Sequence, residues 1–213
     1  MSTIIEKLVE ANESIIAVYF VLLGIERVLY GYCYHLTDHF KQSVRRGYFG
    51  SKIQSEPLYW RCMMELGKWV KVFQFSVLGC DWLVRGNVSG DLCRPMEWTA
   101  ERAIQFFVGL ALVLFGQFLN MAVFRALTPA GVYYGYEFGY RMDYVECFPY
   151  NTNFISDPQY WGVVLSIWGA YIGLGSTSLT VPLLETFWYV MSMQILEHSR
   201  GKPIIEKFRS VGR

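Results

Sequence analysis

The sequence predicts an all-α fold, an integral membrane bundle of four to five helices. Hydrophobic residues make up 53% of the 213-residue chain and charged residues 17%, and the mean hydropathy is +0.24. Globular domains are usually about 45–50% apolar and about 25% charged, so this balance favours a membrane protein. The second observation is a series of apolar runs. The clearest, residues 104–124, is as long as a helix that crosses a hydrocarbon core of about 30 Å.

The first predicted helix covers residues 14–34 and is apolar except for Glu26 and Arg27. These two neighbours point in different directions on a helix, so each needs its own partner in the bundle or a route to the interface. We interpret Glu26 as a structural contact inside the membrane. The second helix, residues 59–84, carries four charged side chains as far as Lys71 and is nearly apolar from there on. This pattern predicts a long helix that enters obliquely from the membrane surface.

The remaining helices follow the clear span of residues 104–124. Thr128 and Pro129 are typical of a helix start, an N-cap followed by proline at the first helical position. Two apolar runs, residues 161–174 and 179–196, are separated by a Gly- and Ser-rich break, which predicts a tight hairpin between antiparallel helices.

Basic residues orient the predicted bundle. They concentrate in residues 35–57 and in the tail after Glu197, whereas the loop at residues 86–97 carries few. With five crossings, the positive-inside rule places both basic segments, and hence the C-terminus, in the cytosol, and the N-terminus in the lumen. Four crossings, with a first or second helix that lies in the interface, stay an alternative.

Three glycines recur every fourth residue after the third span: Gly131, Gly135 and Gly139, interleaved with tyrosines. On a helix this spacing puts them on one face, which lets another backbone or a bound cofactor approach closely. Each glycine costs about 1 kcal/mol of helix stability relative to alanine, so something is expected to press against that face.

Composition also excludes some functions. The net charge of +1 gives no basic surface for nucleic acid. The five cysteines contain no CxxC pair and no adjacent histidine cluster, and no metal site is predicted.

Four short blocks in the C-terminal half resemble the phospholipid N-methyltransferase family, and most closely its plant-type branch. They are Phe115-Gly116-Gln117-Phe118-Leu119-Asn120, Ala130-Gly131-Val132-Tyr133-Tyr134-Gly135 with Phe138-Gly139, Phe148-Pro149-Tyr150, and Asp157-Pro158-Gln159-Tyr160-Trp161-Gly162. The resemblance implies integral membrane enzymes that methylate phosphatidyl-N-methylethanolamine and phosphatidyl-N,N-dimethylethanolamine to phosphatidylcholine. It divides the chain into N-terminal membrane helices with an interfacial segment, residues 1–100, and a catalytic core, residues 101–213, within one compact membrane domain.

The resemblance also implies S-adenosylmethionine as the cofactor. Many members bind it through a Gly-x-Gly in the third span and a Glu-Glu pair after the last span. Here the first glycine position is Leu114 and the second is Gly116, and the acidic pair reads Glu197-His198, so the match is partial. The predicted cofactor residues are Gly116, Gly131, Gly135 and Glu197.

Methyl transfer needs an unprotonated amine, and Glu197 or His198 is the predicted general base, with Glu137 and Glu146 as weaker alternatives. Glu197 has an equal claim to bind the cofactor instead. Methylated ammonium groups are attracted to aromatic faces, which predicts Tyr133, Tyr134, Tyr160 and Trp161 as substrate residues. Arg141 is predicted to contact the lipid phosphate, although cations and tyrosines at a membrane edge also serve as anchors.

Three functional alternatives stay open at this point. The chain is expected to act as a phospholipid methyltransferase, but an isoprenylcysteine-type carboxyl methyltransferase or a catalytically silent structural subunit would share much of the pattern. The expected partners are the bilayer and a phospholipid substrate, with a homo-oligomer or a membrane complex as further options. The endoplasmic reticulum is the expected location and a mitochondrial membrane the alternative.

Overall fold

The computed structural model describes residues 13–47, 58–89, 98–141, 145, 147–150, 155, 157–176 and 178–196. These residues form six α-helices: α2 (Glu13–His35), α3 (Thr37–Arg45), α4 (Tyr59–Ser89), α5 (Ala100–Val132), α6 (Pro158–Gly173) and α7 (Thr180–Met191). A short π-helical turn, η2 (Ser192–Leu196), continues α7. The described segments contain no strand, so the predicted all-α fold is confirmed.

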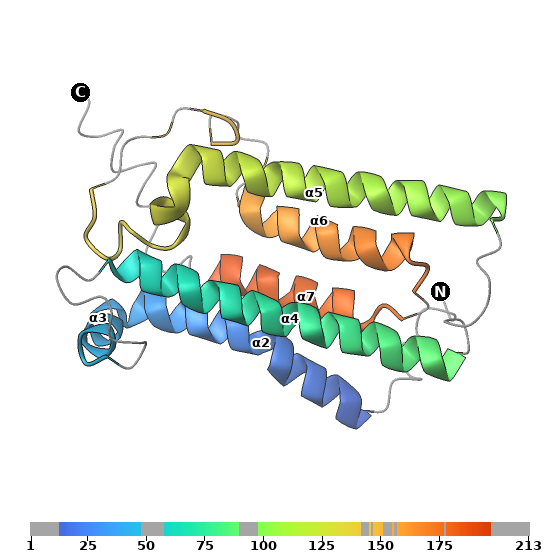
Figure 1. Ribbon diagram of the computed structural model, residues 1–213, viewed down its shortest axis with the longest axis horizontal. Helices are drawn as coiled ribbons and strands as arrows, with labels where there is room; N and C mark the ends of the chain where they lie inside the picture. The colour runs from blue at the N-terminus through green and yellow to red at the C-terminus, as the bar shows by residue number, and fades with distance from the viewer. Residues whose placement is uncertain are drawn as a thin grey trace.

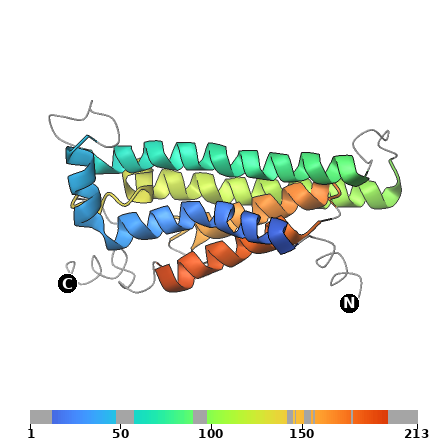
Figure 2. The same cartoon turned by 90° about the horizontal axis from the view of Figure 1, so that it is seen from below.

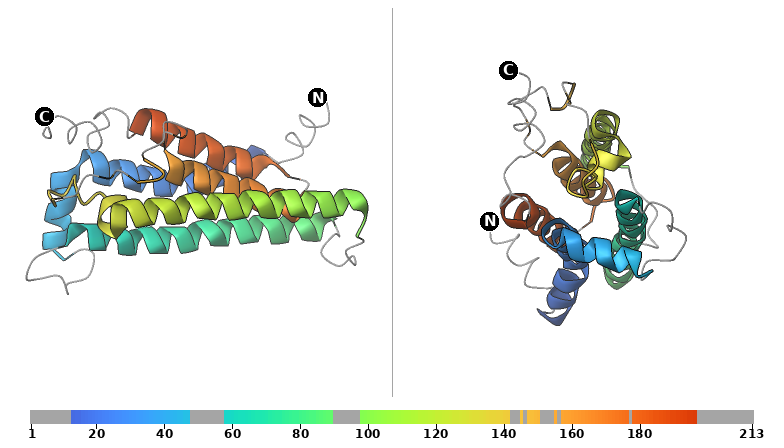
Figure 3. Two further views of the ribbon diagram at one scale, coloured as in Figure 1. Left: turned by 90° about the horizontal axis from the view of Figure 1, so that it is seen from above. Right: turned by 90° about the vertical axis from the view of Figure 1, so that its left-hand side faces the viewer.

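The five long helices run along the length of the molecule, and α3 lies across one end of the bundle (Figure 1 and Figure 2). α5 and α6 lie side by side, and the end-on view in Figure 3 places α2 next to both α4 and α7. Segments 16–35 and 100–132 are each long and apolar enough to cross a membrane. Only 22% of the most apolar stretch of α5 is buried. Most of its apolar side chains therefore face outward, as a bilayer requires. The number of crossings stays a prediction.

α5 and α6 pack with their backbones in contact at glycines. A Cβ added to Gly109 would collide with the backbone of Gly169 and Gly173, and a Cβ added to Gly116 would collide with the carbonyl oxygen of Gly162. Reciprocal collisions occur from the α6 side. Small residues at an interface allow this close approach between membrane helices.

The predicted helix with Gly131, Gly135 and Gly139 on one face is wrong. Thr128 has a non-helical backbone (φ 59°), and Pro129 starts a short helical turn, as predicted, but that turn ends at Val132. Residues 133–139 then form consecutive turns, because Tyr134 (φ 59°) and Gly139 (φ 90°) adopt left-handed conformations that a right-handed helix excludes. The tightly packed glycine face lies earlier, on α5 itself.

The turns at residues 133–139 pack against the end of the bundle that carries α3. The basic segment at residues 35–57 was expected to be a loop, but residues 37–45 are helical. Phe40 and Val44 of α3 are buried, and the ring of Phe40 stacks on Phe138 at 5.3 Å between centroids. At the opposite end, α6 and α7 are joined by the predicted hairpin, in which all residues but one are described.

Candidate functional site

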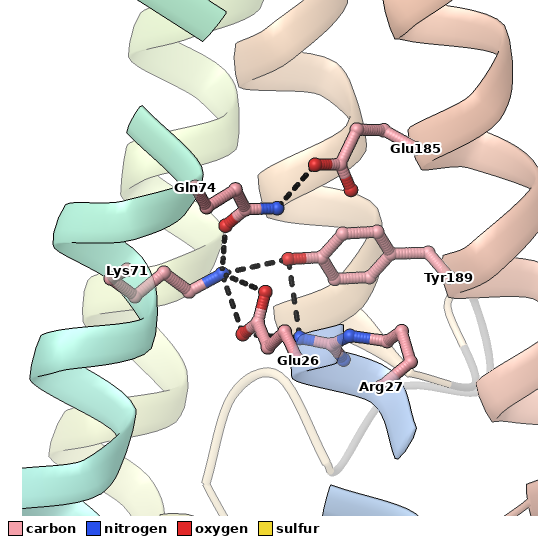
Figure 4. Close-up of polar contacts among 6 residues, drawn as sticks. All are labelled: Glu26, Arg27, Lys71, Gln74, Glu185 and Tyr189. Carbon is pink, nitrogen blue, oxygen red and sulfur yellow. Dashed lines mark hydrogen bonds and ion pairs between the residues drawn. The ribbon is translucent and has the colours of Figure 1, made fainter. Parts of the chain in front are cut away.

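A cluster of buried polar side chains lies inside the bundle. It is placed between two groups of buried apolar residues, one around Cys33 and Phe40 and the other around Leu23 and Val181. It takes two residues from each of three helices: Glu26 and Arg27 from α2, Lys71 and Gln74 from α4, and Glu185 and Tyr189 from α7 (Figure 4). The pairs on α4 and α7 are spaced by three and four residues, so each pair shares one helix face. All six except Lys71 are at most 4% exposed. We call these residues the polar cluster.

Lys71 occupies the centre of the polar cluster. Its Nζ lies 2.9 and 3.1 Å from the two carboxylate oxygens of Glu26. It also donates to Oε1 of Gln74 at 2.9 Å and to the hydroxyl of Tyr189 at 2.8 Å. The ammonium group therefore has a partner for each of its three protons. Because 31% of the Lys71 side chain stays exposed, the cluster reaches the outer surface of the bundle at α4.

Arg27 is 2% exposed and is surrounded by aromatic rings. Its Nη2 forms an ion pair with Glu26 and donates a long hydrogen bond of 3.4 Å to Tyr189. The guanidinium carbon lies 4.2 Å from the ring centroid of Tyr189, 4.9 Å from that of Tyr30 and 5.2 Å from that of Tyr160. Among the described residues, Nε and Nη1 of Arg27 have no hydrogen-bond partner.

Glu185 ends the chain of contacts on the α7 side. Nε2 of Gln74 donates to its Oε1, so Gln74 links Glu185 to Lys71. Oε2 of Glu185 is buried and has no hydrogen-bond partner within the described segments. The polar cluster thus contains unpartnered atoms of both kinds, donors on Arg27 and an acceptor on Glu185.

Three of the predicted substrate residues converge on this cluster. Tyr160, on the first turn of α6, faces both Arg27 and Tyr189, with 5.6 Å between the two tyrosine ring centroids. The ring of Tyr134 lies 5.9 Å from that of Tyr30, which in turn faces Arg27. A Cβ added to Gly67 of α4 would contact both Tyr30 and Tyr133, so Tyr133 also lies close to Tyr30. Burial raises the pKa of Tyr133 above its usual value.

Other predicted residues lie outside this convergence. Trp161 is 37% exposed, and Arg141 is exposed at the end of the turns that follow α5. Gly116 contacts α6, and Gly135 is buried where its own chain folds back on Ala130. Gly131 is half-buried in the short turn after Pro129. Their predicted binding roles stay predictions.

The predicted catalytic pair Glu197 and His198 lies outside the described residues, as does Glu146. Glu197 follows directly on Leu196, where η2 ends. Glu137 is described and half-buried, within the turns at residues 133–139.

Most of the polar cluster is not predicted from the sequence. The pattern at Glu26 and Arg27 predicts for each a partner in the bundle or a route to the interface, whereas Lys71 falls in a segment predicted to be interfacial. No sequence pattern singled out Gln74, Glu185 or Tyr189. Glu185 and Tyr189 are four residues apart within the mostly apolar run at residues 179–196. That spacing is the one signal that could have marked a polar helix face.

Three of the four motif blocks of the C-terminal half lie together, at residues 115–120, 148–150 and 157–162. Gln117 donates to Ser166 at 2.9 Å, Gly116 packs on Gly162, and the ring of Phe118 lies 5.6 Å from that of Phe148. These three blocks, which are separated in the sequence, therefore meet at α5 and α6 and the residues beside them.

Comparisons with known proteins point to one family. Residues 104–202 match the family model described as phospholipid methyltransferase. Phosphatidyl-N-methylethanolamine N-methyltransferase of Arabidopsis thaliana is 46% identical over 56 residues, which are 26% of this chain and 33% of that protein. The matched stretch thus spans about a third of the length of this relative. No solved structure matches the chain.

Proposed function

We propose that this chain, whose residues 104–202 match the phospholipid methyltransferase family, methylates the amine of membrane phospholipids. The proposed substrates are phosphatidyl-N-methylethanolamine and phosphatidyl-N,N-dimethylethanolamine, the proposed methyl donor is S-adenosylmethionine, and the product is phosphatidylcholine. The family match is the observation that carries the proposal, because it contains all four blocks on which the resemblance rests. The matched relative bears the name of an N-methyltransferase that acts on such a lipid.

The described residues fit the charge pattern of this donor in one respect. S-adenosylmethionine carries a carboxylate and an ammonium at its amino-acid end, and the polar cluster presents unpartnered buried atoms of both complementary kinds, on Arg27 and on Glu185. Gly131, Gly135 and Glu197 are the residues proposed to hold it. Gly116 contributes through the close approach of α6, since its backbone contacts Gly162. The donor supplies a methyl group on a positively charged sulfur.

The chain's own residues have three tasks in such a reaction. The amine must lose a proton before it attacks, and Glu197 or His198 is the proposed acceptor. The product nitrogen is a methylated cation, and the rings of Tyr133, Tyr134 and Tyr160 offer it electron-rich faces. Burial of the polar cluster excludes water, which strengthens electrostatic interactions inside the site. Arg141 and Trp161, both exposed, are proposed to contact the lipid at the membrane surface.

The proposed setting is a membrane of the endoplasmic reticulum, with a mitochondrial membrane as the alternative and the C-terminus in the cytosol. Assembly with a second copy or with other membrane proteins belongs to the same proposal. Glycosylation mapping of tagged termini tests the orientation, since only a lumenal site is modified.

A direct test uses the purified full chain with labelled S-adenosylmethionine and each lipid in turn. We expect incorporation into the mono- and dimethylated lipids, and a drop in kcat of about 10²–10⁴-fold in Glu197→Gln if this residue is the base. If Glu197 binds the donor, the KM for S-adenosylmethionine rises instead. Glu65→Gln is the matched control, because Glu65 is an exposed carboxylate paired with Lys68. Absence of incorporation by the wild type with every lipid would refute the proposal.

A further inference from the structure

We propose that Arg27 binds the anionic end of a reactant within the polar cluster, an anion that is either the phosphate of the lipid headgroup or the carboxylate of the methyl donor. The inference rests on the proposed function and adds a binding residue in the half of the chain that lies before the family match at residues 104–202.

Arg27 has unused hydrogen-bonding capacity. Two of its three nitrogen atoms, Nε and Nη1, have no hydrogen-bond partner among the described residues, although the side chain is only 2% exposed. A buried polar group without a partner is costly, and more so when it is charged. Ionisable residues inside a membrane bundle are rare, and they commonly mark substrate pathways or binding sites. The free donors of Arg27 match an oxyanion, for which a guanidinium is well suited.

The charges around Arg27 also favour an added anion there. The carboxylate of Glu26 faces two cations, Arg27 and Lys71, within ion-pair distance. The other carboxylate of the cluster, Glu185, receives its hydrogen bond from the neutral amide of Gln74. Glu26, Arg27 and Lys71 therefore carry one net positive charge. An ionised Glu185 balances this charge over the cluster as a whole, but its hydrogen bond comes from Gln74 and not from Arg27. Lys71 has its three donors engaged, so Arg27 is the cation with capacity for an added anion.

The position of Arg27 also suits a bound anion. The guanidinium lies between the rings of Tyr30, Tyr160 and Tyr189. Of its nitrogen atoms only Nη2 donates to one of these residues, Tyr189, so Nε and Nη1 keep their N–H groups unused. Tyr160 belongs to a motif block of the family-matched region. Tyr30 and Tyr160 are both half-buried, so the rings beside the buried guanidinium reach the surface of the bundle. An anion at Arg27 would therefore lie beside the tyrosines proposed to face the methylated amine.

A purely structural role is the competing explanation, in which Arg27 only neutralises Glu26. The double variant Glu26→Gln/Arg27→Gln separates the two roles, because it removes both charges of the pair together. A glutamine at position 26 keeps a side-chain oxygen that can accept from Lys71, the other partner of Glu26. If the role is structural, this variant folds and binds both reactants like the wild type. If Arg27 binds an anion, the variant folds but binds one reactant weakly.

The experiment measures the affinity of the full chain in lipid nanodiscs for each reactant, independently of turnover. The probes are S-adenosylmethionine, by isothermal titration, and dimethylated phosphatidylethanolamine, by competition with a fluorescent lipid. Arg27→Lys and the double variant are compared with the wild type and with Arg61→Gln, an exposed arginine on α4. Thermal unfolding of each variant reports folding, and Arg27→Lys keeps the buried positive charge.

We expect the dissociation constant of one reactant to rise about 10- to 100-fold in both Arg27 variants, equivalent to about 1.4–2.8 kcal/mol. Loss of donor affinity assigns the carboxylate, and loss of lipid affinity assigns the phosphate. Arg61→Gln binds both reactants unchanged. Wild-type affinity for both reactants in the folded double variant would overturn the inference. Methyl transfer by the wild type is assayed in parallel, so failure of the proposed function is seen separately.

Discussion

The glycine contact between α5 and α6 supports the sharpest test of the packing. In Gly116→Ala the added methyl group collides with the carbonyl oxygen of Gly162 and with Ser166. The serine side chain can rotate away, but the backbone oxygen moves only if the helices separate. The matched control is Gly79→Ala, because a Cβ on Gly79 of α4 meets nothing within 4 Å.

The magnitude follows from two opposing effects. Alanine stabilises a helix by about 1 kcal/mol relative to glycine, which is all that Gly79→Ala should experience. Overpacking a well-packed contact destabilises by about 1–3 kcal/mol. Gly116→Ala should therefore be about 1–3 kcal/mol less stable than Gly79→Ala. Each 1 kcal/mol corresponds to a Tm shift of about 2–4 °C for a chain of this size.

Thermal unfolding of the purified variants in one detergent measures the difference. Gly162→Ala prevents the same close contact of the two backbones from the α6 side. The loss of stability in the double variant Gly116→Ala/Gly162→Ala should therefore be smaller than the sum of the losses in the two single variants. Equal stability of Gly116→Ala and Gly79→Ala would refute the packing. Gly109→Ala, in another glycine contact of the same interface, should lower stability without a specific rise in the KM for the donor.

Two further predictions concern the polar cluster. Lys71→Met leaves Glu26 with fewer partners and should lower the free energy of unfolding by about 3–5 kcal/mol. Lys68→Met, in an exposed pair, should change it by less than about 1 kcal/mol. Chemical unfolding measures both variants, and equal effects would contradict the buried network. Tyr160→Phe should keep the KM for the lipid close to that of the wild type, because the aromatic ring stays over the guanidinium of Arg27. Tyr160→Ala should raise this KM several-fold, and Trp161→Ala, at an exposed position, should raise it less. Kinetics with a saturating methyl donor measure all three variants.

Apolar runs and breakers predicted where most helices lie, because hydropathy and glycine- or proline-rich breaks are local properties of the chain. The long second helix and the hairpin between α6 and α7 are both present. Which face of a helix meets a partner is not local, and here the predictions failed. Lys71 resembled an interfacial cation on its own segment, and only the positions of α2 and α7 show that it points inward. Likewise, spacing by four suggested a glycine face at residues 131–139, but the backbone at Thr128 and Tyr134 leaves the helical region.

The polar cluster also joins the two halves of the chain, because Glu185 and Tyr189 belong to the family-matched region and their partners Lys71 and Gln74 do not. A fragment of residues 98–213 alone would leave these two buried groups without their observed partners. Each such group costs about 1–3 kcal/mol, which is a large fraction of the stability of a folded chain. We therefore expect the fragment alone not to bind S-adenosylmethionine, and co-expression with residues 1–97 to restore binding. Residues 1–97 with Lys71→Met should restore it poorly, and with Lys68→Met fully. Binding by residues 98–213 alone at the affinity of the full chain would show that the matched region builds its site without the N-terminal helices.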